Sequence, residues 1–265
     1  MPVPAEPIRS RSNPLLKRVR AAAAGRGEDE ILLEGDRLVD EALAAGLELT
    51  AVLVAEERAG RLAELARKGV PVRAVGGELL AEVSALESSP GCLALARAPA
   101  ARGPEALPEA PDALVVVAAG IQDPGNLGAL ARTAEAAGAC ALGVTAGGCR
   151  PWSPKALRGS MGSLLRLPVI ELAPTQTSVA ALAARGYRHV CARTRGGTPF
   201  ERFDWSGRVA LWLGGETGAL PGELARASQA FAGVSIPMAG AAESLNVTAA
   251  AAVLLFAAGR ARGAR

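Results

Sequence analysis

The chain is 265 residues long, with 50% hydrophobic, 21% charged and 3% aromatic residues and a net charge of +3. This composition is that of a folded globular protein and excludes a disordered or fibrous chain. The longest apolar run covers residues 249–258, well short of the roughly 20 residues that cross a bilayer, and the first residues lack a secretory signal. We therefore expect a cytoplasmic protein with no membrane partner.

The N-terminal part, residues 1–97, alternates helical and extended patterns. A helix at residues 37–45 is followed by Gly46 as its C-terminal cap. The next patterns predict, in chain order, a strand at 50–54, a helix at 62–68 and an extended segment at 70–75. Residues 98–111 then hold four prolines with little periodicity, which predicts a semi-rigid linker between two domains.

The C-terminal part, residues 112–265, opens with the apolar run 114–117, which is typical of a strand buried in a parallel sheet. Further strands are expected at 140–145, 169–172, 189–192, 209–213 and 234–236. Helical patterns fall between most of them, at 126–137, 179–184 and 222–228. This alternation predicts an α/β fold with a mostly parallel sheet.

Several common site classes are excluded. No Gly-Lys pair exists, so there is no P-loop, and no GxGxxG fingerprint follows the first strand of the C-terminal part. The four cysteines, Cys92, Cys140, Cys149 and Cys191, form no CxxC pair, so we expect free thiols and no metal. The single histidine, His189, has apolar neighbours and is interpreted as structural rather than as part of a serine–histidine pair.

Charge is distributed unevenly along the chain. Residues 1–26 carry six basic side chains against Glu6 alone, residues 27–110 are net acidic, and residues 111–265 hold 15 basic and 9 acidic groups. A basic arm and a basic C-terminal half suit a polyanionic partner, because each neutralised phosphate releases counterions. An ordinary solvated surface is the alternative, since only three of the 29 basic residues are lysines.

Three segments carry the candidate chemistry, and each also has an ordinary structural interpretation. The first, DPGNLGALARTA at residues 123–134, follows a strand: Pro124 and Gly125 are expected to form the turn and Asn126 to cap the helix that carries Arg132. A lone helical arginine is usually just solvated.

In the second segment, LWLGGETGALP at residues 211–221, a buried-type strand ends in two glycines and a carboxylate. Ligands bind at that edge of a parallel sheet, although an exposed turn has the same pattern. The third, IPMAGAAESLNVT at residues 236–248, leads into a helix that Ser244 or Asn246 could cap.

Taken together, the three segments resemble the signature motifs of the SpoU (TrmH) family of RNA ribose 2′-O-methyltransferases, in the same order. Residues 31–43, ILLEGDRLVDEAL, similarly resemble the small substrate-binding domain that many members carry. The resemblance implies a trefoil-knotted SPOUT methyltransferase domain at residues 112–265, an RNA substrate-binding domain at 1–97 and a homodimer. It also implies S-adenosylmethionine as cofactor.

Site residues follow from the same resemblance. The implied catalytic set is Arg132, Asn126, Glu216, Ser244 and Asn246. The implied cofactor-binding set is Gly214, Gly215, Glu216, Ile236, Met238, Ser244 and Leu245. A guanidinium stays protonated to about pH 12 and is a poor base, so we expect Arg132 to orient a phosphate or stabilise the developing alkoxide.

The sequence therefore predicts methylation of a ribose 2′-hydroxyl in structured RNA. The N-terminal domain favours 23S ribosomal RNA as substrate, because transfer-RNA members of the family often lack it. Two alternatives stay open: a transfer-RNA 2′-O-methyltransferase, and an RNA-binding protein that keeps the scaffold without catalysis.

Overall fold

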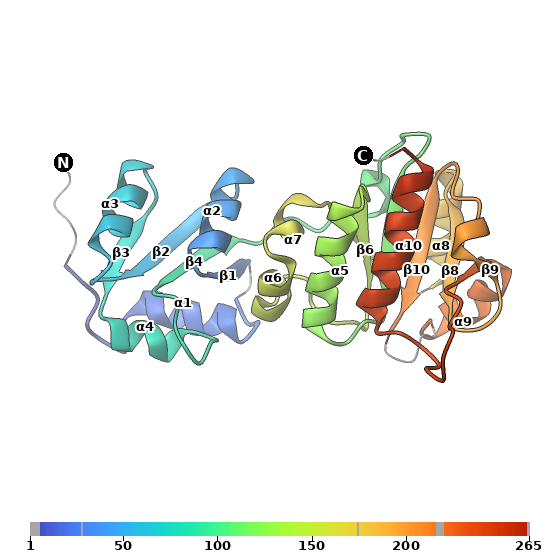
Figure 1. Cartoon of the computed structure of the whole chain (residues 1–265). Helices are drawn as coiled ribbons and strands as arrows, with labels where there is room; N and C mark the ends of the chain where they lie inside the picture. Colours follow the sequence, from blue (N-terminus) through green and yellow to red (C-terminus); the bar gives the residue numbers. More distant parts are fainter. Residues whose placement is uncertain (1–5, 28, 174, 216–219, 264–265) are drawn as a thin grey trace. The chain divides into compact units, whose positions relative to one another are not determined.

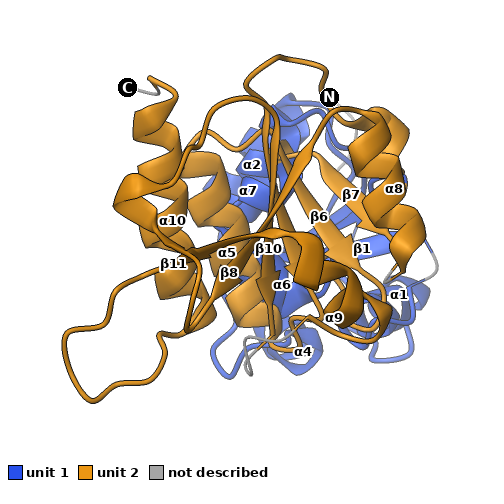
Figure 2. Ribbon diagram, turned by 90° about the vertical axis from the view of Figure 1, so that its right-hand side faces the viewer, with its two compact units in different colours: residues 1–100, 152–165 blue, residues 101–151, 166–265 orange. Residues whose placement is uncertain are grey.

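Figure 1 shows the computed structural model of the chain, which describes residues 6–27, 29–173, 175–215 and 220–263. Two compact units are present (Figure 2): residues 1–100 with 152–165, called unit 1, and residues 101–151 with 166–265, called unit 2. Residues 101–111 of the expected linker belong to unit 2, and residues 152–165 belong to unit 1 although the chain on both sides of them belongs to unit 2.

Unit 1 is built on a four-stranded sheet in the order β1-β4-β2-β3, in which β4 is antiparallel to both neighbours and β3 is parallel to β2. The strands are Glu30–Glu34 (β1), Leu49–Ala55 (β2), Val72–Val75 (β3) and Cys92–Arg97 (β4). The helices are Pro14–Ala23 (α1), Asp36–Ala44 (α2), Ala59–Arg67 (α3) and Gly77–Val83 (α4). Figure 1 shows α1 and α4 on one face of the sheet and α2 and α3 on the other.

The expected elements of this part, α2, β2, α3 and β3, are confirmed with bounds shifted by at most three residues. Gly46 follows α2 with a φ of 72°, the left-handed conformation expected of a capping glycine. α1, β1, α4 and β4 were not predicted. β4 lies between two strands, and five of its six residues are buried, so it lacks the alternation that marks a half-exposed strand.

The basic N-terminal arm is largely part of the folded unit. α1 buries Leu16, Val19 and Ala22 against the sheet. Three arginines of the arm form ion pairs within unit 1: Arg9 with Glu56, Arg11 with Glu82, and Arg18 with Glu30. A phosphate that approached these arginines would have to compete with a carboxylate at each of them.

The segment 152–165 joins unit 1 through a buried carboxylate. It contains two helices, Pro154–Ser160 (α6) and the start of Ser163–Arg166 (α7). Arg158 places Nη1 2.6 Å from Oε2 of Glu34, whose side chain is completely buried. The other oxygen of Glu34 accepts hydrogen bonds from Ser84 Oγ at 2.9 Å and from the Ala85 amide at 2.8 Å. Both oxygens of this buried group are therefore satisfied, as its stability requires.

Unit 2 contains a seven-stranded sheet in the order β7-β6-β5-β10-β8-β11-β9, with every neighbouring pair parallel. Its strands are Leu114–Ala119 (β5), Ala141–Thr145 (β6), Val169–Leu172 (β7), Arg188–Arg193 (β8), Thr198–Pro199 (β9), Val209–Gly214 (β10) and Ala232–Ser235 (β11). The two central strands, β5 and β10, are buried at every position. The expected α/β fold with a parallel sheet is confirmed.

Helices cover both faces of this sheet. They are Pro124–Ala136 (α5), Gln176–Ala184 (α8), Glu223–Ala227 (α9) and Val247–Ala261 (α10), with short 3-10 turns at Pro104–Ala106, Phe200–Arg202 and Ser228–Ala230. Figure 2 shows α5 and α10 side by side on one face, and α8 and α9 on the other. Even α10, which contains the longest apolar run, is too short to cross a bilayer, and the same is true of every other helix in the described ranges.

Strand β11 lies between β8 and β9, which follow one another in the sequence. The connection between β8 and β9 therefore passes close to β11, at Gly197 and Gly233. A Cβ on Gly197 would lie 2.7 Å from the Gly233 carbonyl, and Gly197 has a φ of 87°, so both space and conformation require glycine there. The knot implied by the family resemblance stays a prediction.

His189 is half-buried and packs against the core residues Trp212 and Phe231 of unit 2, which agrees with its structural interpretation. Its ring stacks on Phe231, with centroids 4.8 Å apart, and Nδ1 accepts a hydrogen bond from Trp212 Nε1 at 3.1 Å. A protonated Nδ1 could not accept that bond. Burial lowers the pKa of His189 from its ordinary value of 6.5, so the folded state favours the neutral ring.

We expect this histidine to make the fold sensitive to mild acid. Its stabilising effect is complete above about pH 6.5, where the unfolded imidazole is also neutral, and is lost as the pH falls below that value. The thermal midpoint should therefore drop between about pH 7 and pH 5.5, and His189→Gln should flatten this part of the profile. No other histidine is present in the sequence. An unchanged slope in the variant would assign the acid sensitivity to carboxylates instead.

Candidate functional site

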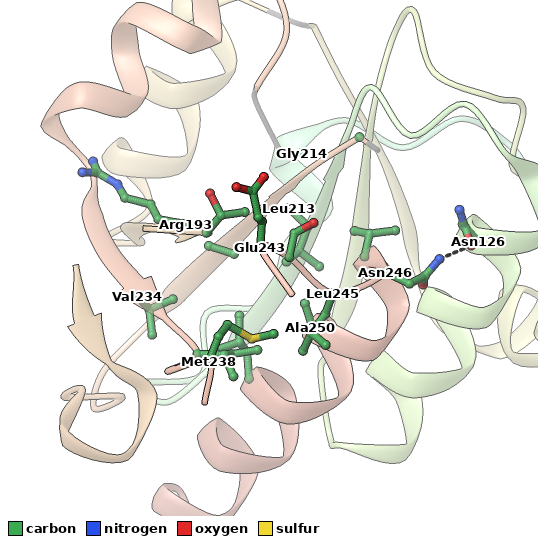
Figure 3. A pocket seen from close by; sticks show the side chains of 17 residues that line it. Asn126, Arg193, Leu213, Gly214, Val234, Met238, Glu243, Leu245, Asn246 and Ala250 are labelled. Atoms are coloured by element: carbon green, nitrogen blue, oxygen red, sulfur yellow. Dashed lines mark hydrogen bonds between the residues drawn. The ribbon is translucent and has the colours of Figure 1, made fainter. Parts of the chain in front are cut away.

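A cavity of about 320 Å³ opens at the carboxyl edge of the sheet of unit 2 (Figure 3). Because the strands are parallel, their carboxyl ends meet at one edge, which is where such sheets bind ligands. β8, β10 and β11 contribute residues at or near their carboxyl ends, and the loops that follow these strands supply a large part of the wall. α10 and one residue of α5 complete it. The lining residues are Asn126, Ala192, Arg193, Thr194, Leu213, Gly214, Gly215, Val234, Ile236, Met238, Glu243, Ser244, Leu245, Asn246, Val247, Ala250 and Leu254.

Most of the residues expected at the site gather around this one cavity. Those that line it are Asn126, Gly214, Gly215, Ile236, Met238, Ser244, Leu245 and Asn246. Arg132 does not: it is exposed on α5, about two turns beyond Asn126. Glu216 lies outside the described residues. The structure thus joins three distant sequence segments and leaves one expected catalytic residue outside the cavity wall.

The start of α5 differs from the prediction. Asn126 does not cap this helix; Asp123 does, accepting a hydrogen bond from the Asn126 amide at 3.0 Å. Pro124 and Gly125 form the first helical turn rather than a separate turn, since a proline at the first position has no amide to leave unpaired. The side chain of Asn126 is therefore not used in capping and lies at the cavity.

Asn246 connects the starts of the two helices. Its Oδ1 caps α10 by accepting from the Thr248 amide at 2.9 Å and from Thr248 Oγ1 at 2.6 Å. Its Nδ2 donates to Oδ1 of Asn126 at 3.5 Å, the dashed line in Figure 3. Of the two candidates for this cap, Ser244 and Asn246, the structure selects Asn246.

The two functions of Asn246 can be separated by substitution. Asn246→Asp keeps the capping oxygen but removes the amide donor, whereas Asn246→Ala removes both. We expect Asn246→Ala to lower the free energy of unfolding by about 1 kcal/mol, and Asn246→Asp to stay close to the parent in urea unfolding. Equal losses in the two variants would show that the contact with Asn126, not the cap, stabilises α10.

A close approach of two backbone segments shapes the floor of the cavity. A Cβ on Gly215 would lie 3.0 Å from the carbonyl oxygen of Gly120, in the loop after β5. Gly120 is held by its amide, which donates to the buried Oγ1 of Thr145 at 3.0 Å. Glycine at position 215 therefore allows the loops after β5 and β10 to approach each other beside the ligand space.

The cavity wall has an apolar part and a polar part. Leu213, Val234 and Leu254 are buried, and Met238 and Leu245 extend the apolar surface to the mouth. Hydroxyl and amide groups are supplied by Asn126, Thr194, Ser244 and Asn246. Such a wall suits a ligand of amphipathic character, with an apolar body and a few hydrogen-bonding groups.

Three polar lining residues, Arg193, Thr194 and Glu243, were missed by the sequence reasoning. Arg193 and Thr194 directly follow the predicted strand 189–192, and the rule that ligands bind at carboxyl ends of strands could have found them. Glu243 lies in the third segment, but it was not predicted because the structural interpretation of this segment concerned its capping residues, Ser244 and Asn246. No group of three or more metal-ligating side chains gathers anywhere in the described ranges.

Two family profiles match the chain. The SpoU rRNA methylase family matches residues 113–256, and the N terminus of the thiostrepton-resistance methylases matches residues 5–110.

Individual proteins are similar over most of the length. A Bacillus subtilis protein, the 23S rRNA (guanosine(2553)-2′-O)-methyltransferase RlmP, is 30% identical over 225 residues, which are 85% of this chain and 86% of that protein. The AdoMet-bound rRNA methyltransferase of Sinorhizobium meliloti superposes with a TM-score of 0.84 at 27% identity, covering 96% of this chain and 97% of that one. AviRb of Streptomyces viridochromogenes with AdoMet gives 0.83 at 28% identity, covering 94% and 98%.

Proposed function

Because this chain belongs to the SpoU rRNA methylase family, we propose that it methylates a ribose 2′-hydroxyl of RNA from S-adenosylmethionine, with 23S ribosomal RNA as the favoured substrate. One observation carries this function: the three motif segments, far apart in the sequence, line a single cavity at the carboxyl edge of the sheet. The names of the similar proteins support the substrate, since RlmP acts on 23S rRNA, and AviRb has been crystallised with AdoMet.

The cavity fits the methyl donor. Its apolar wall offers surface to the adenine and to the carbons bonded to the sulfonium, and the glycines at 214 and 215 let backbone groups approach closely. We assign donor binding to Gly214, Gly215, Ile236, Met238, Ser244 and Leu245. When bound, S-adenosylmethionine supplies an electrophilic methyl group on a sulfonium.

The side chains at the mouth of the cavity act on the RNA ribose. In the reaction an O–CH₃ bond would form at the 2′-oxygen as the CH₃–S bond breaks, with its electron pair staying on sulfur and the hydroxyl proton passing to solvent water. Asn126, Ser244 and Asn246 present polar groups where the hydroxyl would enter, and they orient it. Arg132 stabilises the negative charge that develops on the oxygen or holds the adjacent phosphate, a role that needs no loss of its own proton.

Unit 1 binds the RNA around the target nucleotide. This role of unit 1 is supported by the match of residues 5–110 to the N terminus of thiostrepton-resistance methylases. We place the binding domain at residues 1–97, the linker at 98–111 and the methyltransferase domain at 112–265, with the segment 152–165 packed on the first of these.

The active form is a homodimer. α10 is apolar on its outer face as well as its inner one: Ala249 and Phe256 are exposed, Phe256 by 50%, and Val253 is half-buried on the same face. Exposed apolar surface of this kind marks an interface. The position of Arg132, exposed on the adjoining helix and outside the cavity wall, supports the same arrangement.

Incubation of the protein with tritiated S-adenosylmethionine and undermethylated total RNA tests the proposal. Label in 23S RNA is the expected result. Label confined to transfer RNA would overturn the substrate. Donor binding without any label would indicate that the RNA substrate, such as an assembly intermediate, is missing, and the absence of both label and donor binding would favour the RNA-binding protein that lacks catalysis.

A further inference from the structure

Glu243 is the one carboxylate among the described residues that line the cavity. The other charged residue of the wall, Arg193, directs its guanidinium away from the cavity (Figure 3) and donates to the carbonyls of Ser228 and Phe231 at 3.2 and 3.4 Å. Glu243 therefore provides the only negative side-chain charge on the described part of the wall.

This carboxylate already has a partner in the free protein. Nη2 of Arg195 lies 3.2 Å from Oε1 of Glu243, and both side chains are 81% exposed. Arg195 follows β8 and lines a second hollow of about 510 Å³, which shares Thr194, Ile236, Met238 and Glu243 with the first. Glu243 thus lies between the two hollows, whereas its partner Arg195 lines only the second.

The loop that carries Glu243 is held by few contacts. Residues 239–246 are all exposed. In the part of the chain that the structure describes, residues 237–245 belong to no helix or strand. Their main chain also forms no hydrogen bond with other main-chain groups of the described ranges. The ion pair with Arg195 is one of the contacts that link this loop to the rest of unit 2. Because both side chains are exposed, a competing cation can displace Arg195 at small cost.

We propose that Glu243 recognises the positive charge of the methyl donor and that Arg195 competes with the donor for this carboxylate. The inference rests on the proposed function. S-adenosylmethionine carries a sulfonium that becomes a neutral thioether once the methyl group has left. Glu243 favours the charged substrate over the product, and after transfer it returns to Arg195.

The charge competition predicts opposite effects from two neighbouring substitutions. Glu243→Gln removes the attraction, so the Kd for S-adenosylmethionine should rise about two- to fivefold, the range of an exposed charge pair. Arg195→Ala removes the competitor, so the Kd should fall by a similar factor. In the double variant the gain from Arg195→Ala should disappear, because no carboxylate remains to be released.

Isothermal titration calorimetry of the full chain measures these values, with S-adenosylmethionine and S-adenosylhomocysteine as separate titrants. The loss in Glu243→Gln should be smaller for S-adenosylhomocysteine, which lacks the sulfonium charge, and both effects should shrink in high salt. Arg97→Ala is the control, since it breaks another exposed ion pair, with Glu48 in unit 1, and should leave both affinities unchanged.

Weaker binding in both single variants would overturn the competition, because it would mean that the ion pair only supports the loop. Equal losses for the two titrants would overturn recognition of the sulfonium. If the parent chain bound no S-adenosylmethionine, the proposed function itself would fail. A parent that binds the donor and methylates RNA, combined with unchanged affinities in the variants, would overturn only the role of Glu243.

Discussion

Arg132→Ala is expected to slow methyl transfer about 100- to 1,000-fold, the usual cost of removing one group that stabilises charge in a transition state. The Kd for S-adenosylmethionine should not change, because Arg132 is exposed and does not line the cavity. The fold should also persist, since a surface arginine contributes little to packing. Single-turnover methylation of RNA and donor titration, carried out on the same preparation, separate these effects.

Arg132→Lys is the control that distinguishes the possible roles of this residue. A lysine keeps the positive charge but not the planar fork of the guanidinium. Measurable activity in Arg132→Lys is therefore expected if charge is what matters. A loss as complete as that of Arg132→Ala would contradict a charge-based role and require the specific geometry of arginine.

Arg158→Ala is expected to destabilise unit 1 by about 3 kcal/mol, because it leaves the buried carboxylate of Glu34 without its cation. The remaining donors, Ser84 Oγ and the Ala85 amide, satisfy only the other oxygen. Hydrogen exchange of β1 and β4 during urea titration measures the loss where it arises. Glu34→Gln should cost less, since a neutral amide leaves no buried charge.

Arg166→Ala serves as the comparison for that measurement. Arg166 pairs with Glu135 at 2.7 Å in unit 2, but both side chains are about one-third exposed. Its loss should amount to less than about 1 kcal/mol. Equal effects of Arg158→Ala and Arg166→Ala would show that the segment 152–165 is not anchored through Glu34.

Much of unit 2 could be predicted because its elements carry strong local signals. β5 and β10 are continuous apolar runs that stay buried over their whole length, a pattern typical of a parallel sheet covered on both faces. The alternation with helices then places the ends of these strands at one edge, which is how Gly214 and Gly215 could be assigned to a site.

Other features depend on tertiary contacts that no local pattern records. Asp123 and Asn126 are both good capping residues, and the choice between them follows from where Asn126 meets Asn246. The packing of Arg158 on Glu34 links residues 124 positions apart in the sequence. Glu243 becomes a candidate for binding the methyl donor only in the structure, where its loop lies beside the end of β8.

The central claim is that the methyl group goes to a ribose 2′-hydroxyl of ribosomal RNA, and alkaline digestion of RNA labelled with tritiated S-adenosylmethionine tests it most directly. Alkali cleaves RNA through attack by the 2′-oxygen, so a methylated ribose leaves its 3′-phosphodiester intact. The expected result is label in an alkali-resistant dinucleotide from 23S RNA. Label released in mononucleotides would place the methyl group on a base and contradict the claim.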